Sequence, residues 1–446
     1  MENFQKIARE IFLAAVEKVK PDRLIRDNVN LNGHFLRVAG KEFPLPPEGR
    51  IVVSGAGKAT ALMARELENI LGDRIHKGHI VVKYGHSVPL KIINCTEGGH
   101  PVPDANGATG TCEIVQTISG LSENDIHICL VSGGGSALLA DTPEGVTLEE
   151  LMKLNELLLK CGADITETNT VRKHLSAVKG GGLAQIASPA TTISLILSDV
   201  VNDPLDVIAS GPTVPDPSTF QEVREILEKY RMADQVPPSI RQIFEKGENG
   251  EIPETPKPSH PVFSRVHNFI IGNNRIALEE AKSVANSYGF NTRTVTSSME
   301  GNCEEAAQLI AEQIQATGQA ENTCLLFGGE TTVLVKGKGK GGRNQHLALL
   351  LAKILHENLP GQNATVLCAG TDGSDGPTNA TGAVVDQSTW SKALARSADV
   401  EGFLANNDSY SFFKNTENHI LTGPTMTNVM DVVVVLIGEN SGVTSW

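Results

Sequence analysis

The sequence has neither the long apolar runs of a membrane protein nor the paired cysteines of a disulfide-bonded one. No stretch reaches the ~18 consecutive apolar residues of a membrane-spanning helix, so we expect no membrane partner. Its seven cysteines stand far apart and form no C-x-x-C pair, which excludes a disulfide framework and the usual zinc-binding spacing. A reducing compartment is the simplest interpretation, and we expect a cytoplasmic protein.

The sequence also lacks a broad run of positive charge. The formal net charge is −14, and the two densest basic stretches, 336–343 and 172–179, are short and isolated. Such a chain offers no electrostatic footprint for nucleic acid. The 12 histidines are dispersed without an H-E-x-x-H pair, so nothing indicates a transition-metal site. We expect small molecules as partners, and we leave a homodimer open as the assembly state.

Length and hydrophobic pattern indicate a folded protein of two domains. The 446 residues exceed the ~250–300 at which a single hydrophobic core stops growing. Near the start, Phe4, Ile7, Ile11 and Ala15 recur at the spacing of one helix face. We predict a packed amphipathic helix there and not a secretion signal, because the apolar residues are not continuous.

The first half repeats a short apolar strand, a glycine-rich turn and a helix. Residues 51–53 lead into a turn at 54–58, residues 126–131 into one at 132–136, and residues 191–197 into Ser198 and Asp199. Apolar strands that alternate with helices are typical of a parallel sheet covered on both faces. Ligands bind at the carboxyl ends of such strands, so we expect the three turns to meet at one edge.

Residues 235–261 are rich in proline, glycine and charge, and we interpret them as a linker or surface excursion. The predicted domains are therefore 1–255, with a mostly parallel sheet, and 256–446, an α/β domain with a mixed sheet. In the second domain we predict helices at 277–289, 304–318 and 346–359, and strands at 268–272, 292–296, 323–327, 332–335, 365–369 and 432–437.

A glycine-rich loop at 337–342 opens one of these helices. Its glycines would let backbone N–H groups approach an anion, and Lys336, Lys338, Lys340 and Arg343 add positive charge. The loop contains G-x-G-x-x-G, but an NAD fingerprint also needs an acidic residue at the end of the next strand, which here leads into a Gly-Thr-Asp turn. Phosphates fit the loop better than a ribose. A charged loop in solvent is the competing interpretation.

Two strand-to-helix turns are candidate anion sites without matching a standard motif. Lys58 ends the first and could neutralise a phosphate or a carboxylate, but Val52 and Ala59 stand where a Walker A motif has Gly and Ser or Thr. In the second, three glycines between Ser132 and Ser136 expose backbone donors, without the G-x-S-x-G of a nucleophile elbow. A merely structural turn is the alternative for both.

Residues 169–182 combine Asn169, a basic cluster and three glycines. Arg172, Ser176 and Lys179 would share one face at helical spacing. A solvated charged face is the commoner explanation of such a pattern. The glycines that follow, where a helix should continue, favour a ligand contact.

Carboxylates follow predicted strands in both halves: Asp199 and Asp203, with Asn202, in the first, and Asp372 and Asp375 in the second. Mg²⁺ sites in phosphoryl transfer use one or two carboxylates together with the phosphates. We treat Asp199, Asp372 and Asp375 as candidate Mg²⁺ ligands. Turn chemistry alone also favours Asp and Gly, and the spacing of an EF-hand is missing.

Several strings follow one another along nearly the whole chain. They are SGAGKA from Ser54, GGHPVPD from Gly98, VSGGGSALL from Val131, NTVRKHLSAVKGGGLA from Asn169, LSDVVNDPLDVIASGPTVPDPSTF from Leu197, GGETTVLVKGKGKGGRNQ from Gly328, AGTDGSDGPTNATGA from Ala369, NNDSYSFF from Asn406 and LTGPTMTNVMD from Leu421. Together they resemble the glycerate 2-kinase family, whose second domain is called MOFRL and whose members have also been named hydroxypyruvate reductases. One departure is His346, where the family often has glutamate after GGRNQ.

The resemblance implies a Rossmann-like three-layer domain, a C-terminal α/β (MOFRL) domain and an active site in the cleft between them. It also implies transfer of the γ-phosphoryl group of ATP to the 2-hydroxyl of D-glycerate, with ATP as co-substrate and Mg²⁺ as cofactor. The matching catalytic residues are Lys58, Asp199 and Arg343. Candidate substrate and nucleotide contacts are Gly55, Gly57, Ser132, Gly133, Gly134, Gly135, Ser136, Asn169, Arg172, Lys179, Asn202, Asp203, Glu330, Gly341, Gly342 and Asp372.

Two other functions stay open at this point. An NAD(P)H-dependent hydroxypyruvate reductase would explain the G-x-G-x-x-G string, but the chain lacks the acidic ribose partner and an obvious hydride-transfer pair. A non-catalytic metabolite-binding protein of two α/β domains would bind its ligand tightly without turning over ATP.

Overall fold

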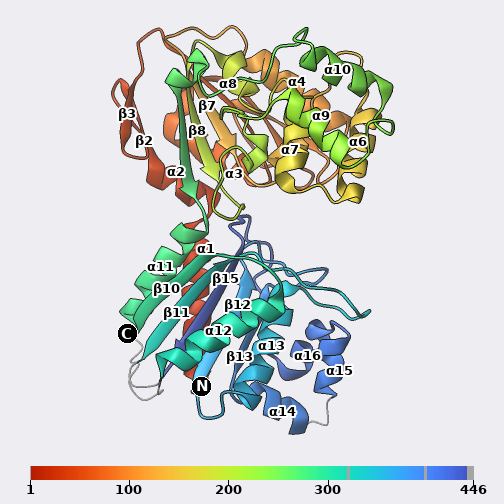
Figure 1. Cartoon of the computed structure of the whole chain (residues 1–446). Helices are drawn as coiled ribbons and strands as arrows, with labels where there is room; N and C mark the ends of the chain where they lie inside the picture. Colours follow the sequence, from red (N-terminus) through yellow and green to blue (C-terminus); the bar gives the residue numbers. More distant parts are fainter. Residues whose placement is uncertain (1, 319–321, 396–398, 439–446) are drawn as a thin grey trace. The chain divides into compact units, whose positions relative to one another are not determined.

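The computed structural model describes residues 2–318, 322–395 and 399–438. The chain divides into two compact units. Leu24–Ile271 form one, here called the central unit, and Met1–Arg23 with the chain from Gly272 onward form the other, here called the terminal unit. Each unit has its own sheet of six strands (Figure 1).

This division differs from the predicted 1–255 and 256–446 at both ends of the first domain. The N-terminal helix α1 (Glu2–Lys18) is present as predicted, but its apolar face packs against α11, β12 and β15 of the terminal unit. Strand β9 (Val266–Gly272) lies beside β8 in the central sheet. Sequence composition changes near residue 255, whereas the last strand of the central sheet comes later.

The central unit is built on a sheet with the strand order β6-β5-β4-β7-β8-β9. Its strands β4 to β8 pair in parallel, which confirms the predicted Rossmann-like sheet. The run of apolar residues explains why β4 and β7 are buried along their whole length. The strands are β4 (Ile51–Ala56), β5 (Ile75–Lys83), β6 (Ile93–Gly98), β7 (Ile126–Val131), β8 (Thr191–Leu197) and β9.

Helices and a small separate sheet surround these strands. Helices α4 and α8 pack on one face through Ile114, Ile118 and Leu183, and α3 contacts β5 and β7. The elements are α2 (Pro21–Asn28), β1 (Val29–Asn32), β2 (Phe35–Val38), β3 (Lys41–Pro44), α3 (Thr60–Leu71), η1 (Gly72–Arg74), α4 (Ala105–Ile118), α5 (Gly135–Leu138), α6 (Leu148–Cys161), α7 (Ile165–Lys173), α8 (Gly182–Ala187), η2 (Ile208–Ser210), α9 (Phe220–Lys229), α10 (Pro238–Glu248) and η3 (Pro261–Arg265).

Part of the predicted linker is a helix. Residues 238–248 form α10, whose Ile240 and Phe244 are buried in a cluster with α6, α7 and α9. Apolar residues at helical spacing inside a polar segment were enough to form an amphipathic helix. The interpretation of 235–261 as a linker is therefore wrong for this stretch.

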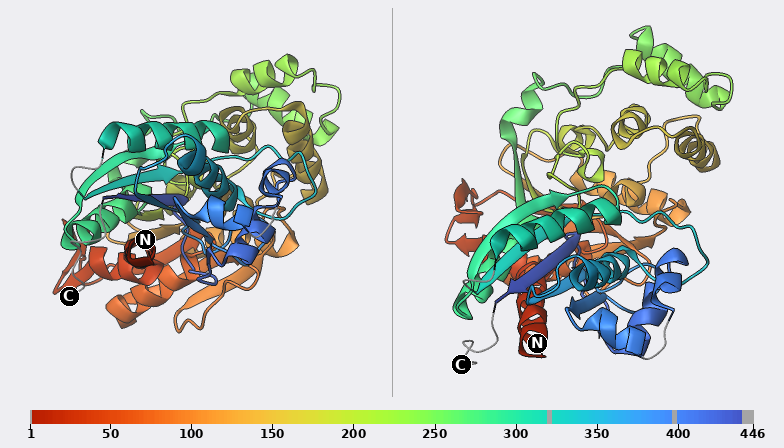
Figure 2. Two further views of the ribbon diagram at one scale, coloured as in Figure 1. Left: turned by 90° about the horizontal axis from the view of Figure 1, so that it is seen from below. Right: turned by 60° about the horizontal axis from the view of Figure 1, so that its bottom comes forward.

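The terminal unit has a mixed sheet in the order β10-β11-β15-β12-β13-β14. Strands β10 and β11 are parallel and the other pairs are antiparallel, as predicted. Helices α12 and α13 cover one face, and α1 with α11 cover the other (Figures 1 and 2). The elements are α11 (Asn274–Ser287), β10 (Asn291–Met299), α12 (Cys303–Thr317), β11 (Thr323–Gly329), α13 (Arg343–Glu357), β12 (Ala364–Gly370), β13 (Gly382–Asp386), α14 (Thr389–Ala395), α15 (Val400–Ala405), α16 (Ser409–Thr416), β14 (His419–Ile420) and β15 (Asp431–Ile437).

The predicted strand at 332–335 is wrong. Thr332 makes a single bridge to Asn302, and Leu334 and Val335 are 65% and 67% exposed. Apart from that bridge, the segment pairs with no strand in the described ranges, so β-propensity alone does not produce a strand.

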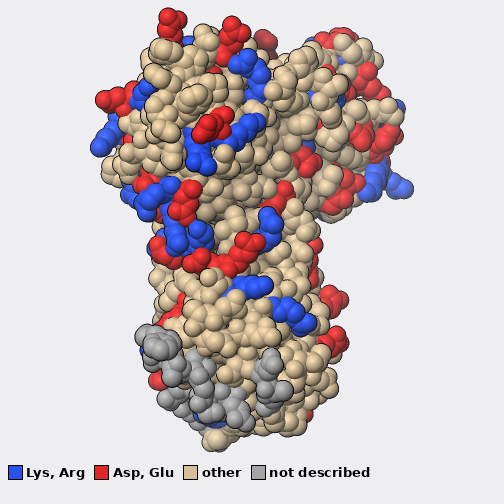
Figure 3. Space-filling model, turned by 90° about the vertical axis from the view of Figure 1, so that its left-hand side faces the viewer, with Lys and Arg blue, Asp and Glu red and all other residues tan. Residues whose placement is uncertain are grey.

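Charge is distributed in small groups. Figure 3 shows Lys and Arg side chains interspersed with Asp and Glu on the face it displays, without a large area of one sign. Among the residues that the structure describes, no helix has the length and apolarity to cross a bilayer.

Candidate active site

The turns after β4, β7 and β8 meet at the carboxyl edge of the central sheet, as predicted. The N–H of Lys58 donates to the carbonyl of Gly133 (2.9 Å), and the N–H of Ser132 donates to the carbonyl of Ala56 (3.2 Å). Asp199, after β8, lies against Gly133, because a Cβ on that glycine would be 1.9 Å from Oδ2 of Asp199. Lys58 and Asp199 thus border the same glycine turn.

Gly134 is the point where this turn approaches two further side chains. Its φ is +85°, and a Cβ there would lie 2.8 Å from Cδ2 of His100 and 3.3 Å from Cε of Lys58. Within the described chain, the N–H groups of Gly133 and Gly134 donate no hydrogen bond. Two bare backbone donors beside a lysine are a natural site for an anion.

The charged groups at this edge influence one another. Burial raises the pKa of Asp199, and the nearby Lys58 opposes that rise. Burial, followed by the positive charge of Lys58 and Lys83, lowers the pKa of His100 to about 4. His100 is therefore neutral at pH 7, and the positive charge near it comes from Lys58 and Lys83.

Two histidines here were missed by the sequence analysis. His100 belongs to the string GGHPVPD, which was noted but not assigned to the site. The ring of His86 contacts the carbonyl of Lys58 through Nδ1 (2.9 Å) and so helps fix the turn that presents the lysine. His86 lies after β5 with no motif around it, so the sequence held no signal for it.

Several predicted ligand residues of these turns face the protein interior instead. A Cβ on Gly55 would lie 2.2 Å from the carbonyl oxygen of Leu130, and one on Gly57 would lie 2.1 Å from Oγ of Ser132. The hydroxyl of Ser132 accepts from the N–H of Ala59 (3.1 Å) at the start of α3. These residues, and Gly135 packed against Ala209, allow strands and turns to pack closely.

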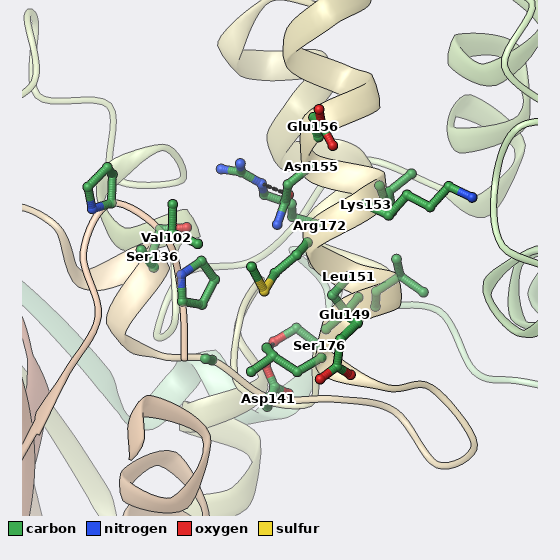
Figure 4. A pocket seen from close by; sticks show the side chains of 18 of the residues that line it. Val102, Ser136, Asp141, Glu149, Leu151, Lys153, Asn155, Glu156, Arg172 and Ser176 are labelled. Carbon is green, nitrogen blue, oxygen red and sulfur yellow. Dashed lines mark hydrogen bonds between the residues drawn. The ribbon is translucent and has the colours of Figure 1, made fainter. Parts of the chain in front are cut away.

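The basic stretch after α6 lies beside the glycine turn. Ser136 pairs with Ser210 (Oγ to Oγ, 2.7 Å), and Ser210 donates to Oδ1 of Asn169 (3.0 Å). The Nδ2 of Asn169 is buried without a hydrogen-bond partner in the described residues. Arg172 donates from Nε to Oδ1 of Asn155 on α6 (2.7 Å) (Figure 4).

The predicted helical face of Arg172, Ser176 and Lys179 is wrong, because α7 ends at Lys173. The three residues nevertheless line one pocket. Lys179 is buried, its Nζ donates to the carbonyl of Leu139 and it forms an ion pair with Asp141 (3.5 Å). Burial lowers its pKa despite that pair.

Asn202 and Asp203 form the turn that follows Asp199. Both have positive φ, +62° and +53°, and the N–H of Asp203 donates to the carbonyl of Val200 (3.1 Å). A tight turn requires these short polar residues in place of glycine, so their position has a structural reason.

In the terminal unit, Arg343 stands at the start of α13 between two carboxylates. It binds Asp431 through Nε (2.6 Å) and Nη2 (3.0 Å) and Glu330 through Nη1 (2.7 Å). Although burial opposes its charge, Asp431 and Glu330 hold the pKa of Arg343 well above its ordinary value. Burial raises the pKa of Asp431 even with Arg343 beside it.

The two aspartates of this unit that were predicted as Mg²⁺ ligands differ in exposure and in hydrogen bonding. Both oxygens of the buried Asp375 accept hydrogen bonds from the N–H groups of Asn344 (3.0 Å) and Gln345 (2.8 Å), so Asp375 caps α13. Asp372 is exposed and accepts from the N–H of Ser374 (2.9 Å). No group of three or more His, Cys, Asp or Glu able to hold a metal lies within the described residues.

Residues 336–340 of the glycine loop before α13 do not offer their backbone N–H groups to an anion. The N–H groups of residues 336–340 donate to Asn406, Asn407 and Asp408, which precede α16. The predicted phosphate nest is therefore already filled by the protein's own oxygens. Gly341 and Gly342 let the loop approach closely, since a Cβ would lie 2.2 Å from Ser409 and 2.4 Å from Asp375, respectively.

Known proteins resemble this chain over nearly its full length. Residues 7–245 match a family model described as a domain of unknown function (DUF4147), and residues 323–431 match the MOFRL family. The chain is 40% identical to the glycerate 2-kinase of Pyrococcus horikoshii, with 99% of each chain covered, and 37% identical to the glycerate kinase of Danio rerio, with 98% of each covered. The crystal structure of glycerate kinase from Thermotoga maritima matches with a TM-score of 0.87 and 41% identity, covering 98% of this chain and 100% of that one.

Proposed function

Because this chain belongs to the glycerate kinase family with a MOFRL domain, we propose that it transfers the γ-phosphoryl group of ATP to the 2-hydroxyl of D-glycerate. One observation carries the proposal: Lys58, Asp199 and the bare N–H groups of Gly133 and Gly134 gather at the carboxyl edge of a parallel sheet. Phosphoryl transfer needs mainly alignment and charge neutralisation from the protein.

Lys58 and the glycine turn hold phosphate oxygens in this proposal. The turn supplies two backbone donors that have no acceptor in the part of the chain that the structure describes, and Lys58 supplies a full positive charge next to them. Such fixed donors stabilise charge that develops on the transferring group without having to reorganise. The neutral His100 adds no competing charge.

Asp199 accepts the proton of the 2-hydroxyl. Burial raises the pKa of its carboxyl, and a carboxylate of raised pKa is a stronger base than an exposed aspartate. The Lys58 charge nearby keeps the anionic form accessible. The two residues therefore act as a pair of opposite charge around the Gly133 turn.

Arg343 is the second cation that the proposal assigns to the phosphoryl group. Asp431 and Glu330 fix its guanidinium, and its raised pKa keeps it charged at any working pH. A positioned arginine can contribute about 10³-fold or more to phosphoryl transfer.

The donor types present fit Mg²⁺ at only some of the predicted ligands. Mg²⁺ prefers one or two carboxylates together with phosphate oxygens. Asp372 is an exposed carboxylate of this kind, although Ser374 donates to both of its oxygens, and Asp199 would bind the metal only in place of accepting the proton. Asp375 does not fit, because α13 occupies both of its oxygens. When bound, Mg²⁺ would neutralise charge on the β- and γ-phosphates.

The alternative function, an NAD(P)H-dependent reductase, has no support at the G-x-G-x-x-G string. The backbone donors of residues 336–340 in that loop are occupied by residues 406–408. A binding protein without catalysis would have no need of a proton acceptor of raised pKa beside Lys58. We further propose a cytoplasmic location, on the ground that all seven cysteines are free thiols.

The test is a pair of assays on the full chain: ADP release with D-glycerate, and NADH oxidation with hydroxypyruvate. We expect ADP release only, with phosphorus NMR identifying the 2-phosphate as product. Lys58→Ala should lower kcat about 10²-fold or more with an unchanged urea unfolding midpoint. ADP release that Lys58→Ala leaves near wild type would refute the role of Lys58, and NADH oxidation without ADP release would refute the kinase.

A further inference from the structure

We propose that a pocket in the central unit, next to the glycine turn, holds the purine and ribose of ATP. The inference rests on the proposed function only in taking ATP as the phosphoryl donor. The pocket has a volume of about 540 Å³, within the range of about 300–1,000 Å³ typical of small-molecule sites. It lies between residues 101–103, α6 and the segment that follows α7.

The walls of the pocket are mostly apolar. Figure 4 shows Val102 and Ser136 on one side, Leu151 of α6 on the other, and Arg172 with Asn155 between them. Val102, Met152 and Leu159 are 55%, 36% and 72% exposed. Apolar side chains left in water around a concave site mark a place where a ligand covers them.

The charge balance favours an uncharged group over a phosphate or a small acid. The lining contains three acidic side chains, Asp141, Glu149 and Glu156, and three basic ones, Lys153, Arg172 and Lys179. Asp141 and Lys179 already pair with each other. A three-carbon hydroxy acid would leave most of the apolar wall uncovered, whereas a flat purine with a ribose would cover it.

Arg172 offers the pocket donors that suit the ring nitrogens of a purine. Arg172 is fixed by its Nε bond to Asn155, while its two Nη groups make no hydrogen bond or ion pair within the described residues. One helical turn earlier, behind the residues that line the pocket, Asn169 has a buried Nδ2 without a partner among the described residues. Guanidinium groups also stack on aromatic faces, which gives Arg172 a second way to hold a base.

The pocket continues into the proposed phosphate site. Ser136 lines the pocket, and Gly134, with its bare N–H, is two residues away, a Cα separation of at most about 7.6 Å. Ser136 is tied through Ser210 to Asn169. A nucleotide with its base between Val102 and α6 can therefore direct its phosphates toward Lys58.

The test is calorimetric titration of the full chain with ADP, CDP and inorganic tripolyphosphate, in the absence of glycerate. Met152→Trp should fill the pocket and weaken ADP binding about tenfold or more, while tripolyphosphate affinity stays within about twofold. Met152→Leu, which conserves volume, should bind ADP like the wild type. We expect CDP to bind the wild type more weakly than ADP, because its smaller base covers less of the wall.

Arg172→Ala gives a second route that does not depend on how Trp packs. It should weaken ADP binding about tenfold without changing tripolyphosphate binding, and Arg224→Ala, a surface arginine on α9 paired with Glu248, should change neither. The inference is overturned if ADP affinity survives both pocket variants, if tripolyphosphate weakens in parallel with ADP, or if CDP equals ADP.

These outcomes separate the pocket from the proposed reaction. Loss of ADP binding in Met152→Trp together with no phosphorylation of D-glycerate by the wild type would keep the nucleoside pocket and refute the acceptor. Phosphorylation of D-glycerate by the wild type with undiminished ADP binding in both variants would keep the kinase and refute the pocket.

Discussion

Arg343 holds Asp431 through two hydrogen bonds, from Nε to Oδ2 at 2.6 Å and from Nη2 to Oδ1 at 3.0 Å. Asp431 is 3% exposed and also accepts from Nδ2 of Asn344 (2.9 Å). The strand β15 thus fixes the arginine that begins α13, although 88 residues separate the two partners. A guanidinium held this way keeps its orientation before any substrate arrives.

The first prediction concerns this pair. Arg343→Ala leaves a buried carboxylate without its partner, and we expect a loss of about 3–5 kcal/mol in the free energy of unfolding of the terminal unit. The double variant Arg343→Ala/Asp431→Asn should recover much of that loss, because the unpaired charge is gone. Urea unfolding followed by circular dichroism measures both. Kinase activity should stay low in both variants, and a double variant that regains activity would contradict the role proposed for Arg343.

The second prediction compares two glycines of nearly equal φ. Gly134 (φ +85°) has His100 and Lys58 within reach of an added Cβ, whereas Gly145 (φ +82°) has nothing within 4 Å. Alanine at either site bears a similar backbone strain of about 1 kcal/mol. Only Gly134→Ala should also displace His100 and Lys58, and we expect its kcat to fall at least about tenfold. Steady-state kinetics of both variants test this, and equal losses would argue against a role for close packing at Gly134.

The third prediction is a pH dependence of stability. His127 is fully buried between Ser54 (2.7 Å) and Thr192 (3.2 Å), and burial lowers its pKa to about 3. Between that pKa and the ordinary value near 6.5, the unfolded chain binds a proton that the folded chain does not. Stability should therefore fall as pH drops from about 6.5 toward 3, by up to about 1.4 kcal/mol per pH unit from this group.

His127→Gln isolates that contribution. The difference between the urea midpoints of the wild type and the variant should shrink or reverse as the pH is lowered from 7 to 4. A difference that stays constant over this range would show that His127 does not titrate in the way its burial implies.

The fourth prediction uses two matched helix caps. Thr147 and Thr219 both form capping boxes, at the starts of α6 and α9, with Glu150 and Glu222. Replacing either threonine by alanine should cost about 1 kcal/mol of stability. Because α6 forms a wall of the pocket, Thr147→Ala should also weaken ADP binding, while Thr219→Ala should leave it unchanged. Calorimetry with ADP distinguishes them, and equal affinities in the two variants would contradict the pocket assignment.

The local sequence was sufficient to predict an element when the residues of that segment alone determine its structure. The apolar runs 126–131 and 191–197 became β7 and β8 with the predicted bounds, because a strand buried on both faces needs only continuous apolar residues. The meeting of Lys58 and Asp199 around Gly133 followed from the rule that parallel strands share one carboxyl edge.

Sequence reasoning failed where residues far along the chain determine the hydrogen bonds of a predicted site. The loop 336–340 has the composition of an anion site, but residues 406–408 occupy its donors, and nothing near 336 indicates this. The sequence likewise did not indicate that Asp431 and Glu330 hold Arg343, whose expected contact with a ligand anion stays a prediction. Asp375 was likewise predicted as a metal ligand, but both of its oxygens accept hydrogen bonds from the start of α13.

The packing of α1 with the terminal unit has a consequence for biosynthesis. The opening helix must find a site formed by β12, β15 and α11, all of which leave the ribosome after the whole of Leu24–Ile271. The central unit can assemble while translation continues, but the terminal unit cannot close around α1 until β15 emerges. Until then the apolar side of α1 stays without its native cover, and exposed apolar surface of this kind makes a nascent chain prone to aggregation.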